Sequence, residues 1–355
     1  MTVTRYGAWA ERLETIAVGR ELVAVAGRRD AGAVVASSVH LLPIASLDKA
    51  TAGWVCDSPS SVNALAFAGD ALLLFGGDEG AIVACDSTVE KKPLAKLPLG
   101  ASVRAIAIDA SVARGDSGAI AVGTADGTLH EITLAIANGT PTFSVTNKRK
   151  LSDGAINCIA RDPAGLWLAG AADGQLWVVG SEQRAVLPGG DGGIRAVVAV
   201  GDGRAVIGCG DGSIRMCYVV GDVEPTDRSG DFGHQGAVRG LALGPLIVDD
   251  AGRESPRRMF SAGEDGVVKL WFLDGARRPK TIEPGIGPIT SIAFAPGPVA
   301  KIEKAAGRLW ATSTSRKVWS TPIGADLDLA GEPTVFLSAF DAYEATLRDA
   351  KAAVR

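Results

Sequence analysis

This chain has little of the material from which most catalytic sites are built. It contains three histidines in 355 residues, His40, His130 and His234, and they fall in different parts of the sequence. A histidine-based metal site or proton relay needs several such groups in one place, so this scarcity argues against that class of enzyme. The sequence also lacks a Walker-type lysine loop and EF-hand ligand spacing, and no cofactor is expected.

Signals for export, membrane insertion and disulfide formation are missing as well. The five cysteines are odd in number and include no C-x-x-C pair, which favours reduced, buried thiols. The chain begins with polar and charged residues, and no apolar run approaches the ~18 residues of a membrane span. These absences predict a cytoplasmic protein. A net charge of −4 argues against nucleic-acid and membrane partners.

What the sequence does contain is a repeat. A six-residue pattern of apolar, polar, small, apolar, usually Ala, and apolar residues occurs seven times, beginning at residues 13, 62, 103, 156, 194, 238 and 289. Most copies are followed by an apolar segment, an acidic residue with Gly, and a second apolar segment. Asp-Gly occupies four of these turns, where Gly accepts a positive φ, and this dipeptide is a strong signal for a β-hairpin.

A more variable segment follows each hairpin and completes a unit of four short strands. Units of this kind at a period of roughly 40–50 residues are typical of propeller blades. We therefore predict an all-β fold over residues 1–337, a seven-bladed β-propeller of four-stranded antiparallel blades. The last blade needs an outer strand, and both Thr2–Arg5 and Thr334–Leu337 are candidates. Apolar residues at helical spacing predict a short C-terminal helix over residues 338–355.

The sixth unit, Gly233–Asp274, resembles a WD repeat. It reads GHQGAVRGLAL and then SAGEDGVVKLWFLD, with the Gly-His pair, the Asp-Gly turn and the Trp of that family. The resemblance implies a WD-repeat β-propeller in which His234, Ser261, Asp265 and Trp271 form a hydrogen-bonded structural tetrad. It also implies a role in protein–protein interaction, because propellers of this family are mostly scaffolds. The other units keep the repeat spacing, but they lack the Gly-His pair and the Trp.

Two surfaces are candidates for binding a protein partner. The second residue of the repeat is polar in all seven copies and should surround the top mouth of the central channel: Glu14, Asn63, Arg104, Asn157, Arg195, Arg239 and Thr290. We call these seven residues the ring. Its arginines suit a carboxylate-bearing peptide, and the alternative is that they pair with nearby acidic turns.

The second surface is formed by insertions expected on the bottom face, at residues 109–118, 248–258 and 296–308. The basic candidates in and near them are Arg253, Arg257, Arg258, Arg277, Arg278, Lys301 and Lys304. Acidic residues are interspersed, so a solvated surface is the alternative. Four turn aspartates should lie on one face of the predicted propeller: Asp126, Asp173, Asp211 and Asp265. We expect them to stabilise their turns rather than to bind a cation.

The sequence thus predicts a non-catalytic scaffold or regulatory subunit, with a protein partner such as an acidic peptide segment or a signalling enzyme. The abundance of Ala, Gly and Arg suggests a bacterial multiprotein complex. Two alternatives stay open. One is a propeller hydrolase or lyase, and the other is a sensor that binds a small ligand at the channel mouth.

Overall fold

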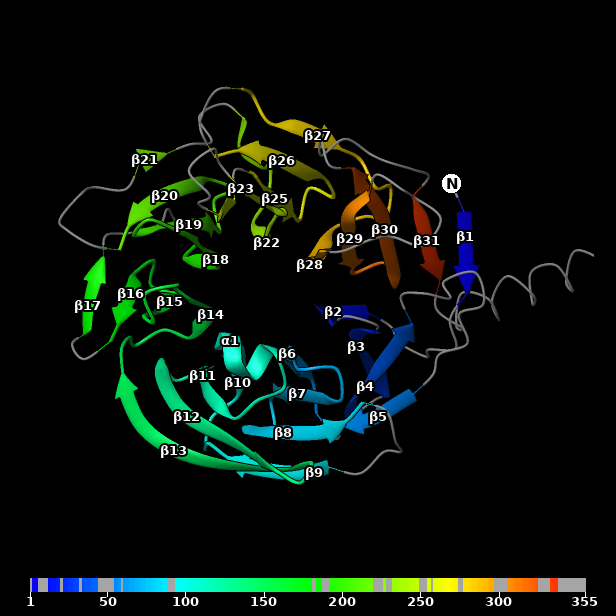
Figure 1. Cartoon of the computed structure of the whole chain (residues 1–355). Helices are drawn as coiled ribbons and strands as arrows, with labels where there is room; N and C mark the ends of the chain where they lie inside the picture. The colour runs from blue at the N-terminus through cyan, green and yellow to red at the C-terminus, as the bar shows by residue number, and fades with distance from the viewer. Residues whose placement is uncertain are drawn as a thin grey trace, which may run out of the picture.

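The computed structural model is a circular arrangement of small β-sheets (Figure 1). It describes residues 2–5, 12–19, 22–31, 34–43, 54–58, 60–87, 93–180, 183–186, 192–219, 226–227, 232–248, 254–256, 258–273, 277–296, 305–324 and 333–337. The predicted helix over residues 338–355 lies outside these ranges.

The described strands form seven larger sheets, which we number in chain order. Sheets one to three contain β2 (Arg12–Val18), β3 (Leu22–Ala31), β4 (Val34–Pro43) and β5 (Trp54–Ser58); β6 (Val62–Ala68), β7 (Leu72–Gly77), β8 (Ala81–Asp86) and β9 (Pro93–Pro98); and β10 (Val103–Ile108), β11 (Gly118–Thr124), β12 (Thr128–Ala137) and β13 (Thr140–Lys150). Sheets four and five contain β14 (Ile156–Arg161), β15 (Trp167–Ala171), β16 (Leu176–Val179) and β17 (Gln183–Val186); and β18 (Ile194–Gly201), β19 (Arg204–Cys209), β20 (Ile214–Tyr218) and β21 (Thr226–Asp227).

Sheets six and seven hold the remaining long strands. They contain β22 (Val238–Leu243), β25 (Arg258–Gly263), β26 (Val268–Phe272) and β27 (Lys280–Ile282); and β28 (Ile289–Pro296), β29 (Ala305–Ser313), β30 (Lys317–Gly324) and β31 (Thr334–Leu337). The first strand of each sheet lies innermost and packs beside the first strand of the next sheet. β28 of sheet seven packs in turn beside β2 of sheet one (Figure 1).

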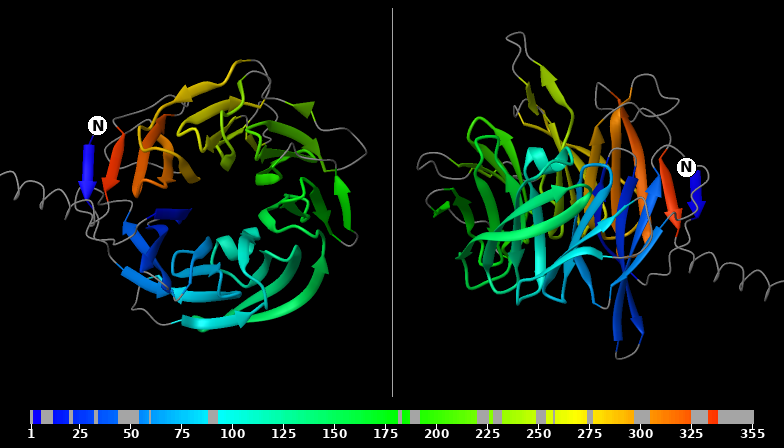
Figure 2. Two further views of the ribbon diagram at one scale, coloured as in Figure 1. Left: turned by 180° about the vertical axis from the view of Figure 1, so that it is seen from behind. Right: turned by 60° about the horizontal axis from the view of Figure 1, so that its bottom comes forward.

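Both candidate strands for the last sheet are used. β31 pairs antiparallel with β30 as the fourth strand, and β1 (Thr2–Arg5) pairs parallel with β31 as a fifth. The two ends of the described chain therefore meet in one sheet (Figure 2). Sheet one is built from β2–β5 without a strand from the other end, so the contact between sheets one and seven depends on side-chain packing. Leu13 and Trp310, both fully buried, belong to that contact.

Adjacent sheets fit together through a small residue on the second strand. Gly76, Gly123, Gly170 and Gly208 each face the first apolar residue of the next inner strand. A Cβ at these positions would lie 2.7, 2.6, 2.5 and 2.4 Å from the nearest side-chain atom of Val103, Ile156, Ile194 and Val238, respectively. In these four sheets, a glycine one residue before the end of the second strand is thus required for packing against the next sheet.

The described strands and helix of the first two insertions lie on one face of the propeller, opposite the face toward which the β3–β4 pair extends (Figure 2). Residues 109–118, expected to be a loop, include a one-turn helix, α1 (Ala110–Ala113), because the Asp109 carboxylate caps it by accepting a hydrogen bond from Val112 N at 2.9 Å. In sheet six, β23 (Leu246–Val248) and β24 (Glu254–Pro256) form a separate two-stranded hairpin. No helix within the described ranges is long and apolar enough to cross a membrane.

Candidate functional site

Every member of the ring sits at an irregularity of its inner strand. The register of the first and second strands shifts across Glu14, Asn63, Arg104, Asn157, Arg195, Arg239 and Thr290, so that each of these residues is the extra residue of a β-bulge. A bulged residue leaves the regular alternation of the strand and its side chain is re-aimed. This explains why the second position of the repeat is polar although apolar residues flank it.

All seven ring side chains line a single cavity at the start of the inner strands. Its volume is about 340 Å³, and its other lining residues are their small and apolar neighbours, including Ala64, Ala105 and Cys158. Burial raises the pKa of the Cys158 thiol to about 12, so this cysteine is not a reactive nucleophile at neutral pH. Three guanidinium groups and one carboxylate face the same space.

The two asparagines of the ring connect neighbouring sheets. Asn63 Nδ2 donates to the Val103 carbonyl at 3.1 Å, and Asn157 Nδ2 donates to the Ile194 carbonyl at 3.0 Å. In each case the acceptor is the first residue of the next inner strand. Thr290 forms a hydrogen bond with Thr312 within sheet seven at 3.0 Å. Asn63, Asn157 and Thr290 therefore hold strands together through hydrogen bonds.

The three arginines differ in how their charge is balanced. Arg239 donates through Nε to Glu264 Oε1 at 2.8 Å, and Arg104 lies 4.0 Å from Asp78 Oδ1. Arg195 donates through Nε to the carbonyl of Gly192 at 3.0 Å, and no described carboxylate pairs with it. The expected alternative, pairing with acidic turns, therefore applies to Arg239 and more weakly to Arg104. Arg195 is the arginine best placed to meet an external anion.

Asp78 anchors Asn63 and Arg104, two residues of the cavity wall. Burial alone would raise its pKa, but hydrogen bonds from Ser102 and Asn63 and the charge of Arg104 bring the pKa below its ordinary value. The Ser102 hydroxyl donates at 2.7 Å and the Asn63 amide at 3.0 Å. Asp78 thus remains ionised near neutral pH and holds sheets two and three together at the mouth.

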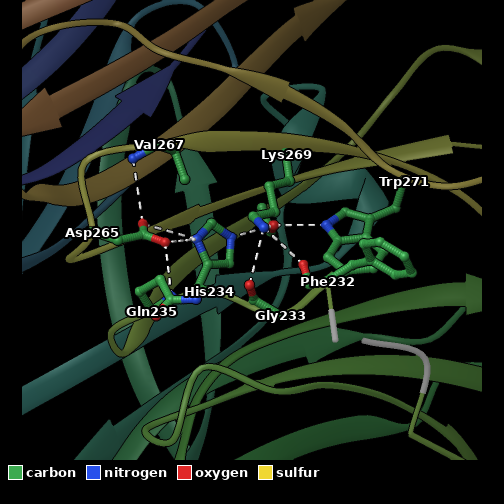
Figure 3. A network of polar contacts seen from close by, with 9 residues as sticks. Phe232, Gly233, His234, Gln235, Asp265, Val267, Lys269 and Trp271 are labelled. Atoms are coloured by element: carbon green, nitrogen blue, oxygen red, sulfur yellow. Dashed lines mark hydrogen bonds and ion pairs between the residues drawn. The ribbon is translucent and has the colours of Figure 1, made fainter. Parts of the chain in front are cut away.

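The four residues of the implied tetrad form one chain of hydrogen bonds in sheet six (Figure 3). Trp271 Nε1 donates to Ser261 Oγ at 2.7 Å, and Ser261 Oγ lies 2.7 Å from His234 Nε2. His234 Nδ1 lies 3.0 Å from both carboxylate oxygens of Asp265. An ionised Asp265 carboxylate can only accept, so the proton of a neutral His234 imidazole is on Nδ1, and Nε2 accepts a hydrogen bond from the Ser261 hydroxyl.

The electrostatic environment keeps His234 and Asp265 of the tetrad each in one protonation state. Burial lowers the pKa of His234, although Asp265 acts in the opposite direction. Burial would raise the pKa of Asp265, but hydrogen bonds from His234 and from the backbone of Gln235 hold it below its ordinary value. A neutral imidazole beside an ionised carboxylate is the result at neutral pH. The tetrad lies within sheet six and does not line the channel cavity.

The aspartates of the hairpin turns stabilise their own turns. Asp126, Asp173 and Asp211 each accept a hydrogen bond from the backbone N–H two residues later, at 3.2, 3.0 and 2.9 Å. Asp265 is also bonded to Val267 N, at 3.3 Å. No group of three metal-ligating side chains occurs among the described residues. These contacts agree with turn formation.

The basic candidates on the opposite face are only partly within the described ranges. Arg253, Arg257, Lys301 and Lys304 lie outside them. Arg258 and Arg277 both stack on Phe272, at 5.0 and 5.6 Å from the ring centroid, and Arg278 stacks on Phe232 at 5.0 Å. The three described arginines are therefore arranged around two phenylalanines at sheet six and do not converge on the channel.

Comparisons with known proteins identify the fold. No protein-family profile matches the chain, and no curated protein matches it in sequence. Among solved structures it is similar to Sqt1 of Chaetomium thermophilum bound to the N-terminus of ribosomal protein L10, with a TM-score of 0.65 over 91% of this chain and 88% of the other at 17% identity. The WD40 β-propeller domain of Doa1 gives a TM-score of 0.60 over 85% and 90% at 15% identity.

The chain has a WD40 β-propeller fold. At these identities the similarity applies to the fold alone. The fold predicted from the repeat is thereby confirmed at the level of an all-β WD40 propeller.

Sequence reasoning missed two features of the ring. It did not identify the bulges, although a polar residue fixed at one position of an otherwise apolar inner strand is the signal that indicates them. It also did not find Glu264, which pairs with Arg239 from the hairpin turn of sheet six. Glu264 directly precedes Asp265, so the sequence pattern assigns it only to the hairpin turn.

Proposed function

We propose that this chain is a non-catalytic scaffold or regulatory subunit that binds a protein partner at the mouth of its central channel. We count its seven larger sheets as the seven blades of one propeller. The partner contributes an acidic peptide segment, and its carboxylate occupies the cavity beside Arg195 and Arg104. Composition supports a cytoplasmic role in a bacterial signalling or enzyme complex.

The observation that carries this proposal is the convergence of the seven bulged residues on one cavity, with Arg195 free of any described carboxylate. An arginine presents a planar set of donors that fits a carboxylate. The Sqt1 structure supports use of this fold for holding a chain terminus, since that protein was crystallised with the N-terminus of ribosomal protein L10. The proposal that this chain binds a carboxylate is based on its own residues, Arg195 and Arg104.

A second function is a sensor for a small carboxylate. The cavity of about 340 Å³ is within the size range of small-molecule sites. An enzymatic role has less support. His234 is held in the tetrad, while His40 and His130 are buried within β4 and β12.

The experiment compares the two faces. A partner captured with the wild-type chain and identified by mass spectrometry is purified, and its affinity is measured for three variants. These are Arg104→Ala/Arg195→Ala/Arg239→Ala, Arg258→Ala/Arg277→Ala/Arg278→Ala, and a chain lacking residues 249–257. We expect the first variant to lose binding while it still melts cooperatively, and the other two to bind as the wild type does. Normal binding by the first variant together with loss in either of the others would move the interface to the opposite face.

A further inference from the structure

Four neighbouring members of the ring alternate between amide and guanidinium side chains. In the order of sheets two to five they are Asn63, Arg104, Asn157 and Arg195, and all four line the channel cavity. Their inner strands are consecutive, because β6 packs beside β10, β10 beside β14, and β14 beside β18. We call these four residues the arc. The arc therefore places two kinds of polar group in turn along one side of the mouth.

The two asparagines of the arc present acceptor oxygens. Asn63 Nδ2 donates to the Val103 carbonyl and Asn157 Nδ2 to the Ile194 carbonyl, which fixes Oδ1 as the other end of each amide. Neither Oδ1 accepts a hydrogen bond from any described residue, and neither is among the buried polar atoms that lack a partner. Both oxygens can therefore accept from an N–H group of a ligand.

Arg195 presents an oriented pair of donors next to Asn157. Its Nε donates to the Gly192 carbonyl at 3.0 Å, which restrains the orientation of the guanidinium group. The two terminal nitrogens, Nη1 and Nη2, have no hydrogen-bond partner among the described residues. Because this edge of a guanidinium matches the two oxygens of a carboxylate, it can bind one through two parallel hydrogen bonds. Arg195 is thus oriented for a carboxylate before a ligand binds.

Arg104, on the other side of Asn157, adds positive charge. Its Nη2 lies 4.0 Å from Asp78 Oδ1, too far for a hydrogen bond, and that oxygen already accepts from Ser102 and Asn63. The Arg104 guanidinium makes no hydrogen bond with a described residue, and its side chain is 43% exposed. Its donors can therefore reach a ligand in the same cavity.

We infer that the carboxylate bound at the mouth is the C-terminal carboxylate of the partner chain, and that a main-chain N–H beside it donates to Asn157 Oδ1. This inference rests on the proposed function, because it specifies the source of the carboxylate. At a chain terminus a single carbon atom separates the carboxylate from the main-chain nitrogen, so both groups reach neighbouring members of the arc together. In Asp and Glu the separation is longer and the link is flexible, which makes the same pair of contacts entropically more costly.

The alternation of the arc also acts against other anions. An inorganic anion such as phosphate offers no N–H group, so the oxygens of Asn63 and Asn157 would face its negative charge without a donor between them. An N-terminal amine or a basic side chain would meet Arg104 and Arg195. The arc therefore favours a ligand that carries a carboxylate and an N–H donor side by side.

The test uses the full chain and Gly/Ser hexapeptides that end in Ala and carry a fluorophore at the N-terminus, with fluorescence anisotropy as the readout. We expect the peptide with a free C-terminal carboxylate to bind at least about tenfold more tightly than its C-terminal amide, as the loss of a charge-assisted pair predicts. An amidated peptide with one internal Asp should recover at most about half of this gain on a logarithmic scale. N-methylation of the last peptide bond should weaken binding about fivefold, because it removes the N–H.

Substitutions in the chain then identify the contacts. Arg195→Ala should abolish the preference for the free carboxylate. Asn157→Ala should weaken binding of the free-carboxylate peptide about fivefold and have no further effect on the N-methylated peptide, because both changes remove the same contact. Cooperative melting of each variant checks that it is folded, and the N-methylated peptide tests the contact without altering the protein. Arg114→Ala, an exposed arginine at the other end of the channel, is the matched control and should change no affinity.

The outcomes for the two proposals are distinguishable. If the amidated Asp peptide binds as tightly as the free-carboxylate peptide and both are lost in Arg195→Ala, the channel site stands and the chain terminus is the wrong source. If N-methylation weakens binding equally in the wild type and in Asn157→Ala, the N–H contact with Asn157 is wrong. If no peptide binds, or binding is indifferent to Arg104→Ala and Arg195→Ala, both proposals fail.

Discussion

Gly208 of sheet five lies so close to Val238 of sheet six that a methyl group on Gly208 would stand 2.4 Å from Val238 Cγ1. Both residues are buried. The contact joins the second strand of one sheet to the inner strand of the next, and it has counterparts at Gly76, Gly123 and Gly170. The spacing between neighbouring sheets is therefore set by these small residues.

We predict that Gly208→Ala destabilises the protein by roughly 1–3 kcal/mol, the usual cost of overpacking a well-filled interior. The measurement is chemical denaturation at neutral pH. A double-mutant cycle with Val238→Ala is the control, because truncating the valine gives the new methyl group space. The double variant should lose less stability than the two single variants together. Simple additivity would show that the two residues do not determine the spacing.

The tetrad of sheet six gives a second prediction. Trp271→Ala should lower the free energy of unfolding by roughly 3–5 kcal/mol, because it removes a large buried ring. His234→Ala and Ser261→Ala should each cost about 1–3 kcal/mol, since each leaves buried polar partners unsatisfied. Ser261→Ala deprives both His234 Nε2 and Trp271 Nε1 of their partner. Wild-type stability in the Ser261→Ala variant would contradict the hydrogen-bonded chain.

Acid should destabilise the fold through its buried histidines. Burial lowers the pKa of His40 from 6.5 to about 4, and it also lowers the pKa of His234. A histidine whose pKa is depressed in the folded state stabilises the fold above its unfolded pKa, and this contribution is lost as the pH falls toward the folded pKa. We predict that stability decreases between pH 6.5 and 4, and that His40 accounts for about 3 kcal/mol of the decrease.

Denaturation curves at pH 7 and pH 4 measure this loss. In the His40→Gln variant the difference between the two values should shrink, because the substituted side chain takes up no proton. Asp265, whose pKa is also below its ordinary value, adds a further loss only at lower pH. An unchanged pH dependence in His40→Gln would assign the acid sensitivity to other groups.

The sequence by itself determined that the chain forms short β-strands joined by hairpin turns, and it determined the spacing at which they recur. Asp-Gly turns at 126, 173, 211 and 265 predicted hairpins, and the structure shows the backbone hydrogen bonds that these aspartates accept. Such signals are local, because a turn depends on a few consecutive residues and their backbone conformations. The tetrad was also predictable, since its residues match one WD-repeat motif, and sheet six brings all four together.

Only the tertiary structure decided how charge is distributed at the channel mouth. The repeat predicts seven polar residues at equivalent positions, but it does not indicate that Arg239 faces Glu264 while Arg195 faces a backbone carbonyl. Those pairings depend on where the turn of each sheet lies relative to the bulge of its inner strand. The same is true of the last sheet, where Thr2–Arg5 and Thr334–Leu337 pair side by side. Contacts between residues distant in sequence depend on how the sheets pack against one another, and no local pattern encodes that geometry.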